Sequence, residues 1–457
     1  MMRLSGTVKL APQARHGPQH SGDQPDSAAH ILGSERPPLL QLDSTQARAR
    51  DGERRPSRWG FELSEKLDDQ PPRVWESLTA SGSIFLQPRF LRAVERTGPT
   101  NFRYRYATAY RVGRPVLAVA TQLIELTGEQ IRLFFNAREA SPPPGAMAAS
   151  ALRGRTVGQT QRMAISLLRD RGARFLVCGS ALSCGFHGVA FGDAGDTADA
   201  WNAVAEALER IRHAEGLSRV TDVSLIKDVP PGTRPAREAL IEGGYRVIDN
   251  EPNMVLRLDP GWKTDRDFLA SMASKYRRSF EKILRRVEEA GCRTEPLDDI
   301  ASCAGALHRL YLQVERRAKL RPSVLPEAFL PTLAVALGES FRCVALRDRA
   351  DRLVGFVTVI RDGATAVGYF MGFDSEVNRT VPVYLRLLYA VVEEALRMGC
   401  RQVSFGRTAL DPKARLGAEP VPLNVWVRYR QPSLNEMIER WLPTVLFEKV
   451  PTRRPFG

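Results

Sequence analysis

The stretch FRCVAL at residues 341–346, which leads through a charged turn into LVGFVTVI at residues 353–360, decides the fold of this chain. Both runs are rich in β-branched and aromatic residues, and together they predict a β-hairpin. The same pattern occurs earlier, where RYRYATAY at residues 103–110 leads through a turn into PVLAVA at residues 115–120. A repeat on this scale indicates two similar α/β domains rather than one large sheet.

A helix and one more strand follow each hairpin. The helices are expected at Trp201–Ala214 and Pro382–Met398, and a glycine, which commonly ends a helix, follows each of them. The next strands are expected at Val223–Ile226 and Val403–Phe405. Hairpins followed by strand–helix–strand crossovers predict mixed, mostly antiparallel sheets flanked by helices.

Domain boundaries follow from these elements. We expect a disordered tail at residues 1–72, because most of that stretch is rich in Gln, Ser, Pro, Gly and Arg and lacks apolar periodicity. An N-terminal domain is expected at residues 73–262, with Met254–Leu258 as its last strand. A C-terminal domain is expected at residues 263–440, followed by a tail at residues 441–457.

The composition is that of a globular protein. Of the 457 residues, 43% are hydrophobic and 26% are charged. No stretch approaches the roughly 18 uninterrupted apolar residues of a membrane span. The N-terminus also lacks the apolar segment of a secretory signal. We therefore expect no transmembrane segment and a cytoplasmic location.

The six cysteines are scattered along the chain and are expected to be reduced thiols. Cys178, Cys184 and His187 lie close together in the sequence, but their spacing is too loose for a zinc site. Small buried residues at a strand end are the other interpretation of this trio. We therefore expect no bound metal.

The net charge of +14 is densest at Lys275–Arg286, where six cations accompany one acid, Glu281. Apolar residues recur there at helical spacing, which predicts an amphipathic helix with a basic outer surface. An ordinary solvated surface is one interpretation. The other is a binding surface for an anionic partner, such as a nucleotide-bearing cofactor, a tRNA or acidic phospholipid.

The segment between Phe373 and Pro382 joins the third strand of the second domain to its long helix. A helix start offers unpaired N–H groups and the positive end of the helix dipole, so it can hold phosphate. Thr380 is expected to cap this helix. An ordinary capped helix without a ligand is the alternative.

The hairpin that ends in LVGFV at residues 353–357, the strand GYFMGF at residues 368–373 and the amphipathic helix Tyr384–Met398 together resemble the GNAT acyltransferase superfamily. The run SFGRTALDPKARLG at residues 404–417 is similar to the BioF-like acetyltransferase domain and to the Fem-type peptide-bridge ligases. Those relatives carry tandem GNAT-like domains, and the resemblance covers roughly residues 75–440. The resemblance thus implies two tandem GNAT-like domains.

The resemblance implies an N-acyltransferase in which an amine attacks an acyl donor directly. The donor would be acyl-CoA, either acetyl-CoA or a longer one, and the acceptor an amine of a small molecule, a sugar or the cell wall. GNAT enzymes hold CoA with a glycine-containing loop, whereas Asn378–Tyr384 contains no glycine. A Fem-type aminoacyl-tRNA-dependent transferase and a non-catalytic GNAT-like binding protein are therefore the alternatives.

Such a reaction needs a general base, an oxyanion donor and groups that hold the carrier. The candidate bases in the C-terminal domain, the one expected to be active, are Asp374, Glu376 and Glu315, and each is also consistent with an ordinary solvated carboxylate. The expected donor-binding residues surround the strand end and the helix start: Met371, Phe373, Arg379, Thr380, Val381, Val383 and Tyr384.

Four polar residues follow the last strand of the second domain, at the strand end where open α/β sheets bind ligands. We expect them to hold a carboxylate or phosphate of the acceptor or the carrier. The alternative is a surface loop in which Arg407 pairs with Asp411. His187 stands between glycines, so no Ser/His/Asp arrangement is expected. The four residues are Arg407, Thr408, Lys413 and Arg415.

Overall fold

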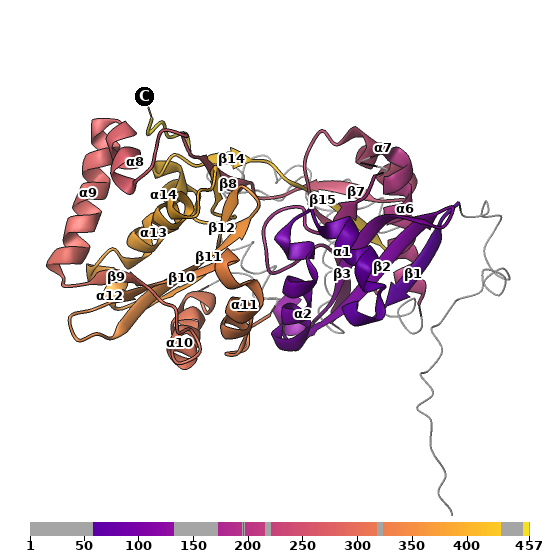
Figure 1. The fold of residues 1–457 in the computed structure, drawn as a ribbon, viewed down its shortest axis with the longest axis horizontal. Coiled ribbons are helices and arrows are strands. Elements are labelled where there is room, and N and C mark those ends of the chain that lie inside the picture. Colours follow the sequence, from indigo (N-terminus) through magenta and orange to yellow (C-terminus); the bar gives the residue numbers. More distant parts are fainter. Residues whose placement is uncertain are drawn as a thin grey trace, which may run out of the picture. The chain divides into compact units, whose positions relative to one another are not determined.

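The computed structural model describes residues 58–131, 172–193, 195, 197–214, 221–317, 323–430 and 451–456 (Figure 1). The expected N-terminal tail before residue 58, and the part of the expected C-terminal tail before residue 451, lie outside the described residues.

The first sheet contains both strands of the first predicted hairpin, and four helices among the described residues flank it. We call this sheet and its helices the N-terminal half. In order along the sheet, the strands are β1 (Gly60–Ser64), β2 (Phe102–Arg111), β3 (Arg114–Leu126), β4 (Ala173–Cys178), β6 (Val223–Val229), β15 (Asn424–Tyr429) and β7 (Arg246–Asp249), and β5 (Val189–Phe191) pairs with β3. The helices are α1 (Pro72–Thr79), α2 (Pro88–Thr97), α6 (Ala198–His213) and α7 (Arg234–Glu242).

The second sheet contains the second predicted hairpin, and with its helices it is the C-terminal half. In the corresponding order, its strands are β9 (Arg293–Pro296), β10 (Phe341–Arg347), β11 (Leu353–Asp362), β12 (Thr365–Phe373), β13 (Gln402–Ser404), β8 (Asn253–Arg257) and β14 (Glu419–Val421). The helices are α8 (Asp265–Ser271), α9 (Ser274–Glu289), α10 (Ala304–Glu315), α11 (Phe329–Leu337), α12 (Val377–Thr380), α13 (Val383–Arg397) and α14 (Leu410–Arg415). Short 3-10 helices occur at Leu67–Asp69, Ile84–Leu86 and Gly338–Ser340.

The two halves exchange one strand each. When the sheets are followed from β1 and from β9, β4 corresponds to β12 and β6 corresponds to β13. The next place holds β15 in the first sheet and β8 in the second. Thus β8, which follows β7 in the chain, pairs with β13 and β14, whereas β15, which follows β14, pairs with β6 and β7.

This exchange differs from the strand assignment that the sequence suggests. The strand at Met254–Leu258 was expected in the N-terminal domain, and its core, β8, completes the second sheet instead. Local apolar patterning predicts that a strand forms, but it does not identify the partner to which the backbone bonds. The boundaries 73–262 and 263–440 remain a prediction.

Parts of both expected tails pack against the rest of the chain. Residues 60–64, assigned to the N-terminal tail, form β1 and pair with β2. Near the C-terminus, Phe456 packs against Trp262 and Phe268, and Pro455 accepts a hydrogen bond from Ala273. Packing against a neighbouring element orders both segments, although their own composition gives little sign of it.

The halves share a hydrophobic core. One cluster contains Trp75 and Phe90 from the N-terminal half together with Leu307 and Phe329 from α10 and α11. In the C-terminal half, α10 and α11 cover one face of the sheet, and α9 and α13 cover the other (Figure 1). Within the described residues, no helix is long and apolar enough to cross a membrane.

Candidate functional site

In the C-terminal half, the pairing between two parallel strands stops well before the end of one of them. β12 pairs with β13 only from Thr365 to Val367, whereas β12 itself continues to Phe373. In the N-terminal half, the corresponding pairing of β4 with β6 continues to Cys178, the last residue of β4. The predicted donor-binding residues Met371 and Phe373 therefore lie on the part of β12 that has separated from its parallel neighbour.

Two residues fix the separated part of β12. The β11–β12 register shifts between Val357 and Val359, and Thr358 lies fully buried at this point. Its hydroxyl donates to the Phe370 carbonyl at 3.0 Å and accepts from the Phe370 N–H at 2.9 Å. At Gly372, a Cβ would lie 2.4 Å from the backbone nitrogen of Tyr311, so only glycine allows α10 to approach this closely.

The helix start that was expected to hold phosphate uses its N–H groups within the chain. Arg379, Val381 and Val383 donate to the carbonyls of Glu376, Val377 and Val381 respectively. Tyr384 donates its N–H to Asn378 Oδ1 at 2.9 Å. Pro382, the N-cap residue, carries no N–H.

The expected cap is therefore corrected. Thr380 directs its hydroxyl to the Val377 carbonyl at 3.3 Å and does not cap α13. The side chain of Asn378 fills that role because α12 places it just before the helix. Thr380 instead accepts, at its carbonyl, a 2.6 Å hydrogen bond from Arg286 of the basic helix α9.

The three candidate bases lie near this junction. Asp374 Oδ1 accepts the N–H groups of Glu376 and Val377, so it orders the turn before α12. Glu376 is 72% exposed and forms an ion pair with Arg379. Glu315 is half-buried at the end of α10, and its charge contributes to the raised pKa of Tyr311, of which burial is the larger cause.

Two of the four expected substrate-binding residues come together with groups from the N-terminal half. Arg407 forms an ion pair with Asp228 and donates from Nε to the Glu251 carbonyl at 3.0 Å. Lys413 is buried and donates from Nζ to the carbonyls of Gly406 and Arg407 at 3.1 and 2.5 Å. Asp228, fully buried, also accepts from Lys227.

We call Lys227, Asp228, Arg407 and Lys413 the cation cluster. In this largely buried place, Lys227 and Arg407 pair with the single carboxylate of Asp228, and the Lys413 ammonium donates to backbone carbonyls beside them. Burial lowers the pKa of Lys227, whereas Asp228 opposes this shift. Cys184 lies beside the cluster, and burial raises the pKa of its thiol.

The backbone around the cation cluster is strained. Asp228, Thr408 and Ala409 have φ values of 64°, 66° and 46°, in the left-handed region that non-glycine residues rarely occupy. Such strain is typical of functional sites, where the surrounding structure holds it. Thr408 is exposed at the edge of the cluster, whereas Arg415 lies outside it and pairs with Asp411. Arg407 therefore pairs with Asp228 and not with Asp411.

His187 does not stand alone, as its sequence position between glycines suggested. Its Nδ1 lies 2.8 Å from Ser83 Oγ, which donates to Asp362 Oδ2 at 2.9 Å. Because Ser83 lies between the imidazole and the carboxylate, this is not the relay of a serine hydrolase, in which the imidazole is central. The chain of contacts joins the N-terminal half to the end of β11.

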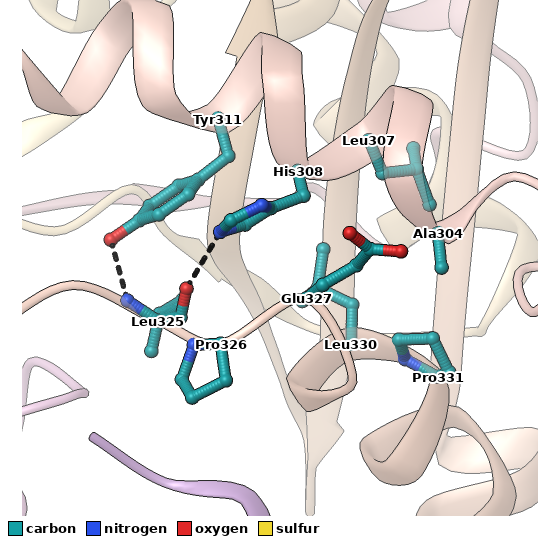
Figure 2. A pocket seen from close by; sticks show the side chains of 9 residues that line it. All are labelled: Ala304, Leu307, His308, Tyr311, Leu325, Pro326, Glu327, Leu330 and Pro331. Carbon is teal, nitrogen blue, oxygen red and sulfur yellow. Dashed lines mark hydrogen bonds between the residues drawn. The ribbon is translucent and has the colours of Figure 1, made fainter. Parts of the chain in front are cut away.

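A separate small pocket lies between α10 and α11 (Figure 2). Within it, His308 Nε2 lies 2.9 Å from the Leu325 carbonyl, and the Tyr311 hydroxyl accepts the Leu325 N–H. These two polar side chains thus hold the backbone of Leu325, and no predicted site residue lines the pocket. Among the described residues, no group of three or more His, Cys, Asp or Glu side chains could hold a metal ion.

Comparison with known proteins agrees with this architecture. Residues 274–418 match the family model of the acetyltransferase (GNAT) domain. The crystal structure of FemX is similar over 83% of this chain and 100% of its own, with a TM-score of 0.50 and 11% sequence identity. The chain has the GNAT/Fem-type fold. The predicted resemblance and fold class are thereby confirmed.

A tandem GNAT protein from the clavulanic acid biosynthesis pathway is also similar, over 82% of this chain and 99% of its own, with a TM-score of 0.46 and 13% identity. By sequence, no curated protein matches the chain. Within the GNAT domain lie β12, α13 and the Arg407–Lys413 part of the cation cluster.

Sequence reasoning missed the N-terminal half of the site. Lys227 and Asp228 lie near the end of β6, which corresponds to β13, the strand that Arg407 follows. A comparison of the two repeats, strand end against strand end, would have drawn attention to this pair. The capping role of Asn378 carried a weaker signal, since asparagine favours both turns and helix caps.

Proposed function

We propose that this chain is an N-acyltransferase whose C-terminal half carries out the transfer. The observation that supports this proposal is the separation of β12 from β13 after Val367, in a domain that matches the GNAT family model. A separated strand presents backbone groups to a ligand, which a fully paired strand does not do. The N-terminal half, whose corresponding strands stay paired, would complete the acceptor site.

In the proposed reaction, the amine of the acceptor attacks the carbonyl carbon of the acyl donor. A carboxylate among Asp374, Glu376 and Glu315 takes the amine proton, directly or through water. A backbone N–H of the segment Met371–Phe373 stabilises the oxyanion. The tetrahedral intermediate then collapses to the amide: the C–S bond of a thioester or the C–O bond of an aminoacyl ester breaks, and the leaving sulfur or oxygen of the carrier takes up the proton.

The cation cluster is proposed to bind an anionic group of the acceptor or the carrier. Lys227 and Arg407 share the single carboxylate of Asp228, so a carboxylate or phosphate of the ligand would balance the second positive charge. Thr408, exposed on the strained turn beside Arg407, would contact the same ligand. Arg415 lies farther out in its pair with Asp411 and would contribute long-range attraction only.

For the donor, the match to a GNAT domain favours acyl-CoA. A specific observation favours the second candidate, an aminoacyl-tRNA. The N–H groups of Arg379, Val381, Val383 and Tyr384, which were expected to meet the CoA phosphates, already bond within the chain. The basic helix α9 reaches the same junction through Arg286 and would supply charge for tRNA. We also propose a cytoplasmic location, where both donors occur.

Thermal unfolding of the full chain with each ligand tests these proposals. Acetyl-CoA, longer acyl-CoAs, uncharged tRNA and aminoacylated tRNA are compared at equal ionic strength. A ligand at one hundred times its dissociation constant adds about 2.7 kcal/mol of stability, which is readily seen as a shift in Tm. A shift that depends on the acyl chain supports acyl-CoA, and a shift with tRNA alone supports the Fem-type donor. Absence of any shift, together with no transfer of labelled acyl groups to amines, would refute the enzyme proposal.

A further inference from the structure

The outer face of α9 carries a row of cations. Phe280 and Val287 are buried and pack this helix against the rest of the C-terminal half. On the opposite side of the helix, four exposed cations fall within a sector of about 80° and extend over about 15 Å of its axis. We call these four residues, Lys275, Arg278, Lys282 and Arg285, the basic stripe.

The chain itself provides few counter-charges for the basic stripe. Among the described residues, no ion pair or side-chain hydrogen bond involves Lys275, Arg278 or Lys282. Arg285 meets Glu289 only at 3.8 Å, a loose and exposed contact. The stripe therefore keeps most of its positive charge available to a partner outside the chain.

This arrangement is unfavourable for the helix itself. Side chains three or four residues apart are neighbours on a helix surface, and like charges at this spacing destabilise it. The helix dipole also repels cations near its N-terminus, and α9 has no acidic residue in its first turn. On α6, by contrast, Arg210 and Arg212 lie in the last turn and pair with Glu206 and Glu209. An anionic partner would relieve the repulsion along α9.

The form of the stripe favours a lipid surface over a nucleic acid. Proteins that bind unpaired nucleotides alternate cations with exposed aromatic rings on which bases stack. The aromatic residues of α9, Tyr276 and Phe280, instead pack into the core of the C-terminal half. Arg454, exposed next to the Pro455 that accepts the Ala273 N–H, widens the basic surface beside the helix start. Clusters of four or more Lys or Arg on an amphipathic helix are typical of surfaces that bind acidic lipids.

We propose that the basic stripe docks the chain on a membrane surface that contains acidic phospholipid. The apolar side of α9 is buried within the protein, so the contact is electrostatic and nothing inserts into the bilayer. Each Lys or Arg near such a surface strengthens binding about fivefold, and salt weakens the attraction. The inference does not depend on acyl transfer or on the donor. The tRNA considered above as a second donor would compete for α9, and the test distinguishes the two partners.

Co-sedimentation of the full chain with phospholipid vesicles tests the docking surface. Vesicles of phosphatidylcholine alone are compared with vesicles that also contain phosphatidylglycerol. The wild type is expected to bind only the anionic vesicles, and less as the ionic strength rises. A variant in which all four residues of the basic stripe are changed to Gln should bind at least about tenfold more weakly. The matched control loses four exposed cations of the N-terminal half and should keep most of the binding; its changes are Arg73→Gln, Arg114→Gln, Arg234→Gln and Arg237→Gln.

Equal losses in the two variants would overturn the proposal, because net charge alone would then explain the binding. Failure of the wild type to bind anionic vesicles, or equal binding to neutral ones, would do so as well. Retention of tRNA on filters is measured in parallel. If the stripe variant loses tRNA binding but keeps vesicle binding, the stripe is a nucleic-acid surface and the proposal is wrong. Circular dichroism confirms folding, and the stripe variant should unfold at an equal or higher Tm, because the repulsion along α9 is removed.

Discussion

The two halves have corresponding strands, but one pair of parallel strands is hydrogen-bonded over a different part of its length in each half. In the N-terminal half, β4 and β6 stay paired to the end of β4, and the loop that follows folds back onto β3. There Gly179 donates to Ala120, which in turn donates to Gly188. In the C-terminal half, β12 leaves β13 after Val367. The same order of strands therefore gives a parallel pair that stays bonded to the end of β4 in one half and only along the start of β12 in the other.

The halves also meet at corresponding strand ends. Asp228 near the end of β6 pairs with Arg407 just after β13, and both segments contain strained residues. The N-terminal half thus contributes the charge of Asp228 to Arg407 of the C-terminal half. If this interpretation is correct, changes at the junction should affect both stability and ligand binding, whereas matched changes elsewhere should affect neither strongly.

The largest effect is expected for Asp228→Ala. This change leaves Lys227 and Arg407 without their buried carboxylate, and breaking a buried ion pair in this way costs about 3–5 kcal/mol. Urea unfolding measures the loss. Asp411→Ala, which removes a partly exposed carboxylate paired with Arg415 and Arg453, is the control and should cost less than about 1 kcal/mol. Equal losses in the two variants would show that Asp228 does not join the halves as described.

A smaller effect is expected for Gly372→Ala. The added Cβ meets the backbone of α10, so β12 must move, at a cost of about 1–3 kcal/mol. Acyl transfer should fall more steeply than stability, because the separated strand carries the proposed oxyanion donor. Gly368→Ala on the same strand meets Val391 no closer than 3.4 Å and should be tolerated. Full activity of a folded Gly372→Ala variant would argue against a role for this strand segment.

Most of the fold could be predicted from the sequence, because its signals are local. The hairpins around Gly113 and before Gly363, and the long helices before Gly399 and near Gly216, follow from apolar periodicity and turn residues. The exchange of β8 and β15 could not be predicted, since any apolar strand can pair with more than one edge. Strand β1 was missed because its five residues follow a long polar stretch.

Only the C-terminal part of the cation cluster was singled out from the sequence, and its role as a site stays a prediction. Arg407 and Lys413 were found because they follow a strand in the order that the family resemblance suggests. Lys227, Asp228, Ser83 and Asp362 lie far from them in the sequence, and only the packing of two halves brings these groups together. Long-range charge pairs have no periodicity, so the sequence does not show which distant charges pair, although a comparison of the two repeats points to Lys227 and Asp228.

The contact of His187 with Ser83 and Asp362 predicts a dependence of stability on pH. Burial lowers the pKa of His187 to about 4, although Asp362 opposes this, whereas an ordinary histidine has 6.5. Between these two pH values the unfolded chain binds more protons at this histidine than the folded chain does, so the free energy of unfolding falls as the pH is lowered. The stability that depends on neutral His187 is therefore fully present above pH 6.5 and is lost as the pH falls toward 4. His187→Gln should flatten the fall in urea midpoint over this range. An unchanged pH profile would show that His187 is not buried in this state.

The smallest effect is expected for Asn378→Ala. Loss of the side chain that caps α13 should cost about 1 kcal/mol of stability and free the Tyr384 N–H. If the capped helix start is what disfavours CoA, the variant should bind CoA more tightly, with tRNA binding unchanged. Thr197→Ala removes the corresponding cap of α6, where Thr197 accepts from Ala200, and should lose similar stability without any gain in CoA affinity. Weaker CoA binding in Asn378→Ala would contradict this expectation. Asn378 would then help to hold the donor, and the C-terminal half would be a CoA-dependent acyltransferase.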